Sequence, residues 1–298
     1  MTWLPSLLRV PLVVLLIVLS TIVHTSVLFA IALVKGLVPV AGFRAACGRV
    51  LVRIAESWIA FNSGLVDAFT PTRVDASGLD GLRTDGHYLV LANHRSWVDI
   101  IVLQKVLNRR VPFLRFFLKR QLIWVPFLGL AWWALDFPFM QRASRKALAR
   151  RPELAGKDMA ATRKACEKFL GMPVSVMNFV EGTRLTPEKH ARQAPPYAHL
   201  LRPKAGGVAL VLEAMGQALH SVLDVTIAYP QGTPTLGDLV SGRIPRVRVD
   251  VRARPIPDEL RGLDYEGDPA ARVLYQRWLN ALWADKDALL ASQLEHAP

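Results

Sequence analysis

A histidine and an aspartate with the spacing of a candidate catalytic pair occur in the sequence Asn93-His94-Arg95-Ser96-Trp97-Val98-Asp99. A carboxylate that holds one ring nitrogen of a histidine leaves the other nitrogen free to act as a base. On one uninterrupted helix this spacing corresponds to about 140° of rotation, so the two side chains would not share a face. They could meet if a turn folded His94 back toward the first turn of a helix that contains Asp99. The alternative is a helix cap formed by Ser96 or Asn93, with His94 and Asp99 at the surface.

The residues on either side predict where this pair lies in a fold. An apolar run at residues 88–92 reads as a buried strand, and residues 100–103 read as the start of a buried helix. A second strand-like run at 174–178 precedes Phe179-Val180-Glu181-Gly182-Thr183-Arg184, whose glycine allows the backbone to turn. Polar residues thus follow two strands, and in open α/β sheets ligands bind at the carboxyl ends of strands.

The two segments together resemble a known enzyme family. Asn93-His94 with Asp99, followed later by Phe179 and Glu181-Gly182-Thr183-Arg184, resembles the motifs of the glycerolipid acyltransferases, typified by 1-acyl-glycerol-3-phosphate acyltransferase. The resemblance implies transfer of a fatty acyl group from a thioester, acyl-CoA or acyl-carrier protein, to the free hydroxyl of a lysophospholipid. The expected acceptor is 1-acyl-glycerol-3-phosphate and the product phosphatidic acid.

The resemblance also implies roles for particular residues. His94 would be the base that takes the proton of the acceptor hydroxyl, and Asp99 would fix its ring. The substrate phosphate needs cations, and a guanidinium can bind it through two hydrogen bonds, which favours Arg184. Glu181 would orient the glycerol hydroxyls or pair with Arg184. Ser96 as a nucleophile remains an alternative.

Further family-like blocks add candidates for substrate binding. Residues 117–129 resemble the block in which a lysine, here Lys119, precedes an apolar helix, and Arg142 matches the arginine of the next block. Asp136 departs from the family pattern because a glycine is usual there. Pro203-Lys204, followed by a glycine, resembles a later block that places a lysine near the substrate. Backbone N–H groups after His94, or near Gly182 and Thr183, could stabilise an oxyanion.

Composition narrows the classes of partner. The 298-residue chain has a formal net charge of +13, and 52% of its residues are hydrophobic. A basic chain prefers anionic partners, and the hydrophobic content favours lipid over nucleic acid. Neither a zinc-finger spacing nor an aromatic-basic repeat occurs, so we expect no nucleic-acid partner. We expect no cofactor and no metal site, because His94 and Asp99 alone are too few ligands. Cys47 and Cys166 have no pairing context, which suits a reducing compartment.

The first 70 residues predict a membrane anchor. Residues 12–34 carry no formal charge and are long enough to cross a bilayer core of about 30 Å. Residues 51–69 are mildly amphipathic and could lie in the interface. One span followed by an interfacial helix and a two-helix hairpin that dips into one leaflet both remain open. Because positive residues follow the run, we place the remaining chain on the cytoplasmic side of an inner membrane.

Residues 71–298 then form the predicted catalytic domain. The alternation of apolar runs and helical patterns predicts an α/β fold with a mixed central sheet flanked by helices. We expect a loop at 185–201, a buried strand at 222–230, an edge strand at 246–253 and a closing amphipathic helix at 270–294. The alternatives in function are another lysolipid acceptor (lysocardiolipin-like or glycolipid), a transacylase with a phospholipid donor, and a non-catalytic membrane-tethered lipid-binding protein.

Overall fold

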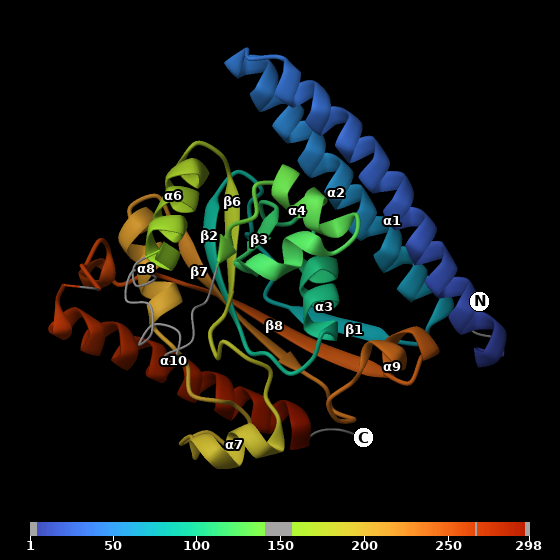
Figure 1. The fold of residues 1–298 in the computed structure, drawn as a ribbon. Helices are drawn as coiled ribbons and strands as arrows, with labels where there is room; N and C mark the ends of the chain where they lie inside the picture. The colour runs from blue at the N-terminus through green and yellow to red at the C-terminus, as the bar shows by residue number, and fades with distance from the viewer. Residues whose placement is uncertain (1–4, 141–156, 266, 296–298) are drawn as a thin grey trace.

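A six-stranded mixed β-sheet forms the centre of the protein (Figure 1). The computed structural model describes residues 5–140, 157–265 and 267–295. The strands of the central sheet, in chain order, are β1 (Arg73–Ser77), β2 (His87–Ala92), β3 (Leu114–Phe116), β6 (Val174–Phe179), β7 (Ser221–Ala228) and β8 (Arg246–Arg254). Their order across the sheet is β1-β8-β7-β2-β6-β3. A separate small sheet pairs β4 (Leu118–Lys119) with β5 (Phe139–Met140).

The register of the sheet determines which residues meet at its edge. β7 and β8 run antiparallel, and the other neighbouring pairs are parallel. Ala92 at the end of β2 lies opposite Phe179 of β6 and Val225 of β7. The residues that follow β2, β6 and β7 therefore emerge at one edge of the sheet.

Helices cover both faces of the sheet, as predicted. The helices, in chain order, are α1 (Ser6–Leu37), α2 (Ala41–Phe69), α3 (Val98–Leu107), α4 (Leu128–Ala134), α6 (Lys157–Leu170), α7 (Pro187–Gln193), α8 (Gly206–Met215), α9 (Leu236–Ser241) and α10 (Pro269–Glu295), with short 3₁₀ turns η1 (Arg120–Trp124) and η3 (Asp258–Leu260). Alternate residues of β2 enter opposite cores, because successive side chains of a strand point to opposite faces. Val90 packs in a core with α2, α3 and α4, whereas Leu89 packs in a core with α6, α8 and α10.

The N-terminal segment consists of two long helices that pack against each other (Figure 1). Residues Leu7–Leu37 of α1 are long and apolar enough to cross a membrane. The indole of Trp58 in α2 donates a hydrogen bond to the Thr21 hydroxyl of α1 at 3.1 Å. The second helix begins at Ala41, ten residues before the start predicted from its amphipathic pattern. Its position in a membrane stays a prediction.

Two predictions for the second half of the chain were wrong. Residues 185–201 contain a short helix, α7, which begins at Pro187 and is capped at its N-terminus by Thr186. The three prolines suggested a loop, but proline is favoured in the first turn of a helix. β8 is not an edge strand, because β1 pairs with its outer side. The alternation of buried and less buried residues along β8 shows that one face of the strand is solvated. It does not indicate whether a neighbouring strand pairs with β8 in the plane of the sheet.

The closing helix α10 contributes a buried lysine to the sheet. Lys286 is almost fully buried and forms an ion pair with Asp224 of β7. Its ammonium group also donates a hydrogen bond to the Val225 carbonyl at 2.6 Å. Asp224 has a second cationic neighbour, because Arg254 of β8 lies 3.3 Å from its carboxylate. The sequence predicted the helix; its buried residues include Tyr275, Leu279, Leu282 and Trp283, and Leu274 and Trp278 pack partly buried against the same core.

Asp136 adopts a left-handed backbone conformation, with φ 63°. Glycine, which the family resemblance predicts at this position, reaches positive φ without steric cost. In this chain the carboxylate of Asp136 forms ion pairs with Lys35 of α1 and Lys168 of α6. Asp136 therefore links the end of α1 to α6.

Candidate active site

Three strands deliver polar side chains to the same edge of the sheet. His94 follows β2, Glu181 follows β6 and Tyr229 follows β7. Because these strands are parallel neighbours, the three residues meet around the N-terminus of α3, which begins at Val98. Asp99 lies in the first turn of α3. The two polar segments that follow strands in the sequence therefore lie at one edge of the sheet.

His94 and Asp99 form a direct hydrogen bond. The turn between β2 and α3 folds His94 back, and its Nδ1 lies 2.8 Å from Asp99 Oδ2. A carboxylate only accepts hydrogen bonds, so Nδ1 carries the proton and Nε2 is the basic nitrogen. The His94 ring stacks on Phe179 with 3.9 Å between ring centroids and 14° between planes. The Asp99 partner and the Phe179 ring together fix the orientation of the imidazole.

Asp99 is buried and accepts further hydrogen bonds. The backbone N–H groups of Arg95 and Ser96 donate to Oδ2 at 2.7 and 2.9 Å, and the Tyr229 hydroxyl donates to Oδ1 at 2.6 Å. Burial and the neighbouring carboxylate raise the pKa of Tyr229 well above its ordinary value, so the phenol stays protonated and remains a donor. With His94 Nδ1, four donors therefore surround the Asp99 carboxylate.

The expectation that N–H groups directly after His94 stabilise an oxyanion was wrong. The Arg95 and Ser96 amides are bound to Asp99, and the His94 amide donates to Glu181 Oε1 at 3.3 Å. These donors point into the protein because the tight turn wraps around the Asp99 carboxylate. Ser96 is also engaged: its hydroxyl donates to the Pro234 carbonyl at 2.6 Å. A buried hydroxyl committed in this way is poorly placed to act as a nucleophile.

Glu181 is fully buried beneath this turn. Its Oε1 accepts from the His94 amide, and its Oε2 accepts from the Leu201 amide at 3.2 Å. Burial raises the pKa of Glu181 to about 8, although these amides and the Arg95 guanidinium act in the opposite direction. Glu181 does not pair with Arg184 in a salt bridge, contrary to one expectation. Its contacts instead join the segment after β2 to the segment before α8.

The turn at Gly182 brings three cationic side chains together. Gly182 has φ 69°, a conformation that L side chains rarely adopt, and a Cβ built there would lie 3.2 Å from Lys204 Nζ. Lys189 of α7 donates to the Thr183 hydroxyl at 2.7 Å and to the Arg184 carbonyl at 2.8 Å. The exposed guanidinium of Arg184 lies 4.9 Å from the centroid of the Trp97 ring. A cationic rim therefore adjoins the buried His94–Asp99 pair.

Comparison with known proteins identifies the family. A sequence model of the acyltransferase family matches residues 73–230, more than half of the chain. The chain belongs to the acyltransferase family. Lysocardiolipin acyltransferase 1 of Gallus gallus is 26% identical over 255 residues, which cover 80% of this chain and 62% of that protein. 1-acyl-sn-glycerol-3-phosphate acyltransferase 3 of Arabidopsis thaliana is 28% identical over 230 residues, or 73% and 56% of the two chains.

A solved structure shows the same fold. The 1-acyl-sn-glycerophosphate acyltransferase PlsC of Thermotoga maritima aligns with a TM-score of 0.54 at 18% identity, covering 94% of this chain and 98% of that chain. The likeness at this identity concerns the fold alone. The chain spans less than two thirds of the length of the curated acyltransferases named above. The predicted α/β class, with a mixed sheet flanked by helices, is confirmed.

One predicted substrate-binding cation of this acyltransferase, Lys119, is not part of the described network around His94. Lys119 is exposed at the end of β4, in the small second sheet. Arg142 lies outside the described residues. Lys204, which the sequence offered only as a family-like lysine, lies against Gly182 and is closer to the site than Lys119.

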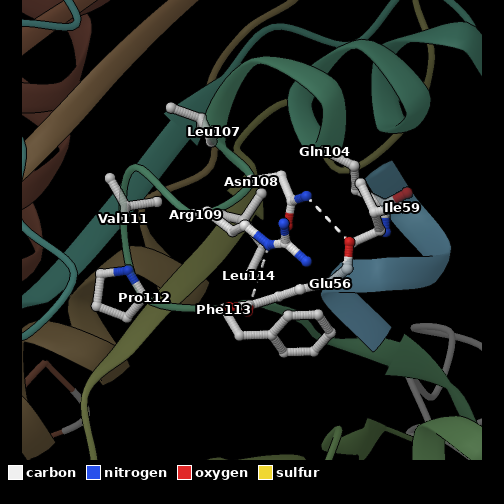
Figure 2. Close-up of a pocket in the computed structure, with 10 residues that line it drawn as sticks. All are labelled: Glu56, Ile59, Gln104, Leu107, Asn108, Arg109, Val111, Pro112, Phe113 and Leu114. Atoms are coloured by element: carbon white, nitrogen blue, oxygen red, sulfur yellow. Dashed lines mark hydrogen bonds and ion pairs between the residues drawn. The ribbon is translucent and has the colours of Figure 1, made fainter. Parts of the chain in front are cut away.

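Two cavities lie next to α3, on the side of the N-terminal helices. The smaller, shown in Figure 2, is lined by Glu56, Asn108 and Arg109 and lies at the C-terminal end of α3. Nine helical steps separate Asn108 from Asp99, or roughly 13 Å, so this cavity is not the catalytic centre. The larger encloses about 460 Å³, including space open to solvent. It is apolar and lies between α1, α2 and α4, with Leu28, Trp58 and Trp132 in its lining.

Sequence inspection missed two residues that organise the site. Tyr229 was noted only as the end of a strand, yet it holds Asp99. Asn93 was noted as part of the first motif and as a candidate helix cap, yet its amide exchanges two hydrogen bonds with the Ile227 backbone, each at 2.9 Å. The Asn93 bonds join the end of β2 to β7, and the Tyr229 bond joins the end of β7 to α3, so both contacts connect segments that lie far apart in the sequence. A polar residue next to a buried strand end is the one local signal that could have pointed to them.

Proposed function

We propose that this acyltransferase transfers a fatty acyl group from a thioester to the free hydroxyl of a lysophospholipid, with His94 as the general base. The observation that carries the proposal is the hydrogen bond from His94 Nδ1 to the buried Asp99, which leaves Nε2 as the basic nitrogen. An alcohol is a poor nucleophile at neutral pH, and a positioned base contributes typically about 10²–10⁴-fold to the rate.

In the proposed reaction, Nε2 takes the hydroxyl proton as the alcohol oxygen attacks the thioester carbonyl. The new C–O bond forms a tetrahedral intermediate, and the imidazolium is stabilised by ionised Asp99. The intermediate collapses as the C–S bond breaks, and the leaving thiolate takes the proton from His94. Direct transfer needs no nucleophile from the enzyme, which agrees with the commitment of the Ser96 hydroxyl to a backbone carbonyl.

The proposed acceptor is 1-acyl-glycerol-3-phosphate, which would yield phosphatidic acid. The rim formed by Arg184, Lys189 and Lys204 supports a phosphate-bearing acceptor, because guanidinium and ammonium groups bind phosphate through charge-assisted hydrogen bonds. Glu181 would fix the position of His94 by accepting a hydrogen bond from its backbone amide. Similarity to proteins named lysocardiolipin acyltransferases favours a second candidate, a larger lysolipid with more than one phosphate.

We further propose that α1 anchors the enzyme in an inner membrane with the sheet domain on the cytoplasmic side. The cationic residues Lys35, Arg44, Arg49 and Arg53 follow the apolar run, and positive residues prefer the cytoplasmic side. The donor would be acyl-CoA or acyl-carrier protein, both of which are available on that side.

The test is an assay of purified protein in liposomes with labelled oleoyl-CoA and lysophosphatidate. Wild type should form phosphatidate, and His94→Ala should lose about 10²–10⁴-fold in rate. The matched control is His190→Ala, since His190 of α7 bonds the Tyr197 carbonyl and lies outside the proposed chemistry. An active, folded His94→Ala variant would overturn the proposed base. A monolysocardiolipin acceptor preferred over lysophosphatidate would select the second candidate.

A further inference from the structure

An exposed apolar surface lies on η1 and α4, apart from the catalytic edge of the sheet. Four large apolar side chains on this segment are exposed: Trp124 by 85%, Phe127 by 49%, Leu130 by 51% and Trp133 by 60%. Soluble proteins rarely expose contiguous apolar patches of this kind without a partner. Leu130 and Trp133 share one face of α4 because residues three apart on a helix are neighbours. Ala131 and Ala134 of the same helix are buried in the protein.

The backbone holds Phe127 outward in a strained conformation. Its φ is 61° and its ψ is −52°, and the Leu128 amide donates to the Pro126 carbonyl at 2.7 Å. This is a γ-turn with positive φ, a rare and strained form. Such strain persists where the surrounding structure enforces it and gathers at sites of function. Phe127 is exposed, so packing in the core does not explain this strain, and we take the strain as a sign of a functional role.

The charge beside the patch identifies the partner. Lys119 and Arg120 are exposed immediately before it, and residues 118–133 contain no acidic side chain. Basic heads next to apolar and aromatic side chains suit the boundary between lipid head groups and acyl chains. Tryptophan in particular is enriched at this depth. The surface is also continuous with the predicted membrane helix, because α4 packs against α1.

We infer that residues 119–133 form a second membrane contact, which inserts Trp124, Phe127, Leu130 and Trp133 into the interface of an anionic bilayer beside α1. Lys119 and Arg120 would then bind lipid phosphates. The apolar cavity between α1, α2 and α4 is lined by Leu128 and Trp132 of the same segment, so insertion would place that cavity next to the acyl chains of the bilayer. This inference does not depend on the chemistry of His94.

The experiment compares two exposed positions on opposite sides of the sheet. Trp124→Cys and Val273→Cys would each be labelled with an environment-sensitive fluorophore, since Val273 of α10 is 56% exposed and lies on the other layer. The background is full-length protein with Cys47→Ala. Cys166 can stay, because burial raises the pKa of its thiol to about 12 and so suppresses its reactivity.

The labelled proteins would be reconstituted in phosphatidylglycerol–phosphatidylethanolamine vesicles with and without a doxyl-labelled lipid. We expect a blue shift and doxyl quenching at position 124 and neither at position 273. Arg120→Glu should weaken the quenching at 124, and phosphatidylcholine vesicles should do the same. His94→Ala should leave it unchanged, which separates this inference from the proposed reaction. An unquenched label at 124 overturns the inference. Efficient disulfide crosslinking of two unlabelled Trp124→Cys molecules also overturns it, because that result would assign the surface to a second copy of the chain.

Phe127→Gly provides an independent test of the strained turn. Glycine adopts positive φ freely, so the variant should raise the melting temperature of the protein while weakening doxyl quenching at position 124. A lower melting temperature with unchanged quenching would show that Phe127 serves packing and would remove the turn from the inferred membrane contact.

Discussion

The two halves of the candidate site are built in opposite ways. In the His94–Asp99 half, Asp99 is buried, the His94 side chain is only 13% exposed, and four donors surround the Asp99 carboxylate. The Gly182–Arg184 half is exposed, and its cations are held by long side chains at the surface. Both halves lie at the same edge of the same sheet. The difference teaches that the orientation of the base is fixed by several bonds at once, whereas the proposed phosphate-binding cations can adapt to the head group.

The largest expected effect comes from Asp99→Asn. An amide cannot enforce the Nδ1–H tautomer or stabilise an imidazolium, so we expect kcat to fall by about 10⁴-fold with little change in KM. Stability should fall by about 1.5–3 kcal/mol, because backbone donors lose a charged acceptor. Steady-state kinetics and chemical denaturation measure the two effects. A change confined to KM would contradict the assignment of Asp99 to the buried, chemical half.

Arg184→Ala tests the exposed half and should mainly change KM. Loss of a charge-assisted contact of about 1.5–3 kcal/mol corresponds to roughly a tenfold to 150-fold rise in KM for lysophosphatidate, with kcat nearly unchanged. An acceptor that lacks phosphate, such as a monoacylglycerol, is the control and should show no difference between the variant and wild type. Equal losses for both acceptors would show that Arg184 acts on the reaction and not on phosphate.

Glu181→Gln tests how burial is coupled to pH. The pKa of Glu181 is raised from 4.5 to about 8 in the folded protein. The folded state therefore favours the protonated carboxyl, and the associated stability is complete below pH 4.5 and is lost as pH rises to about 8. We expect the melting temperature of wild type to fall relative to the variant across this interval and to run parallel to it above. Parallel curves throughout would mean that Glu181 is ionised when folded.

The smallest effect is expected outside both halves, at Asp136. Asp136→Gly relieves positive φ but removes the ion pairs with Lys35 and Lys168, so the two contributions of about 1 kcal/mol should nearly cancel. Asp136→Ala keeps the strain and loses the pairs, and it should be less stable than Asp136→Gly by about 1 kcal/mol. Thermal denaturation of wild type, Asp136→Gly and Asp136→Ala measures these differences in stability. Equal stability of the alanine and glycine variants would contradict the role of the backbone strain.

Local patterns predicted much of the fold and part of the candidate site. Buried strands such as β2 and β7 were visible as apolar runs, and the turn after His94 could be anticipated because a continuous helix would separate it from Asp99. The hydrogen bond from Tyr229 to Asp99 could not be anticipated, because it depends on β7 lying next to β2 in the sheet, and sequence spacing does not encode this order. The burial of Glu181 depends in the same way on Leu201, a residue in a segment predicted to be a loop.

Lys286 has a consequence for the synthesis of the protein. It lies in α10, the last helix of the described chain, and neutralises Asp224, which is buried in a central strand. While a ribosome is still translating residues 269–295, the sheet carries this carboxylate with Arg254 beside it but without Lys286, and a buried charge that lacks one of its partners is unfavourable. The domain that holds the candidate site therefore completes its folding only after α10 has been made.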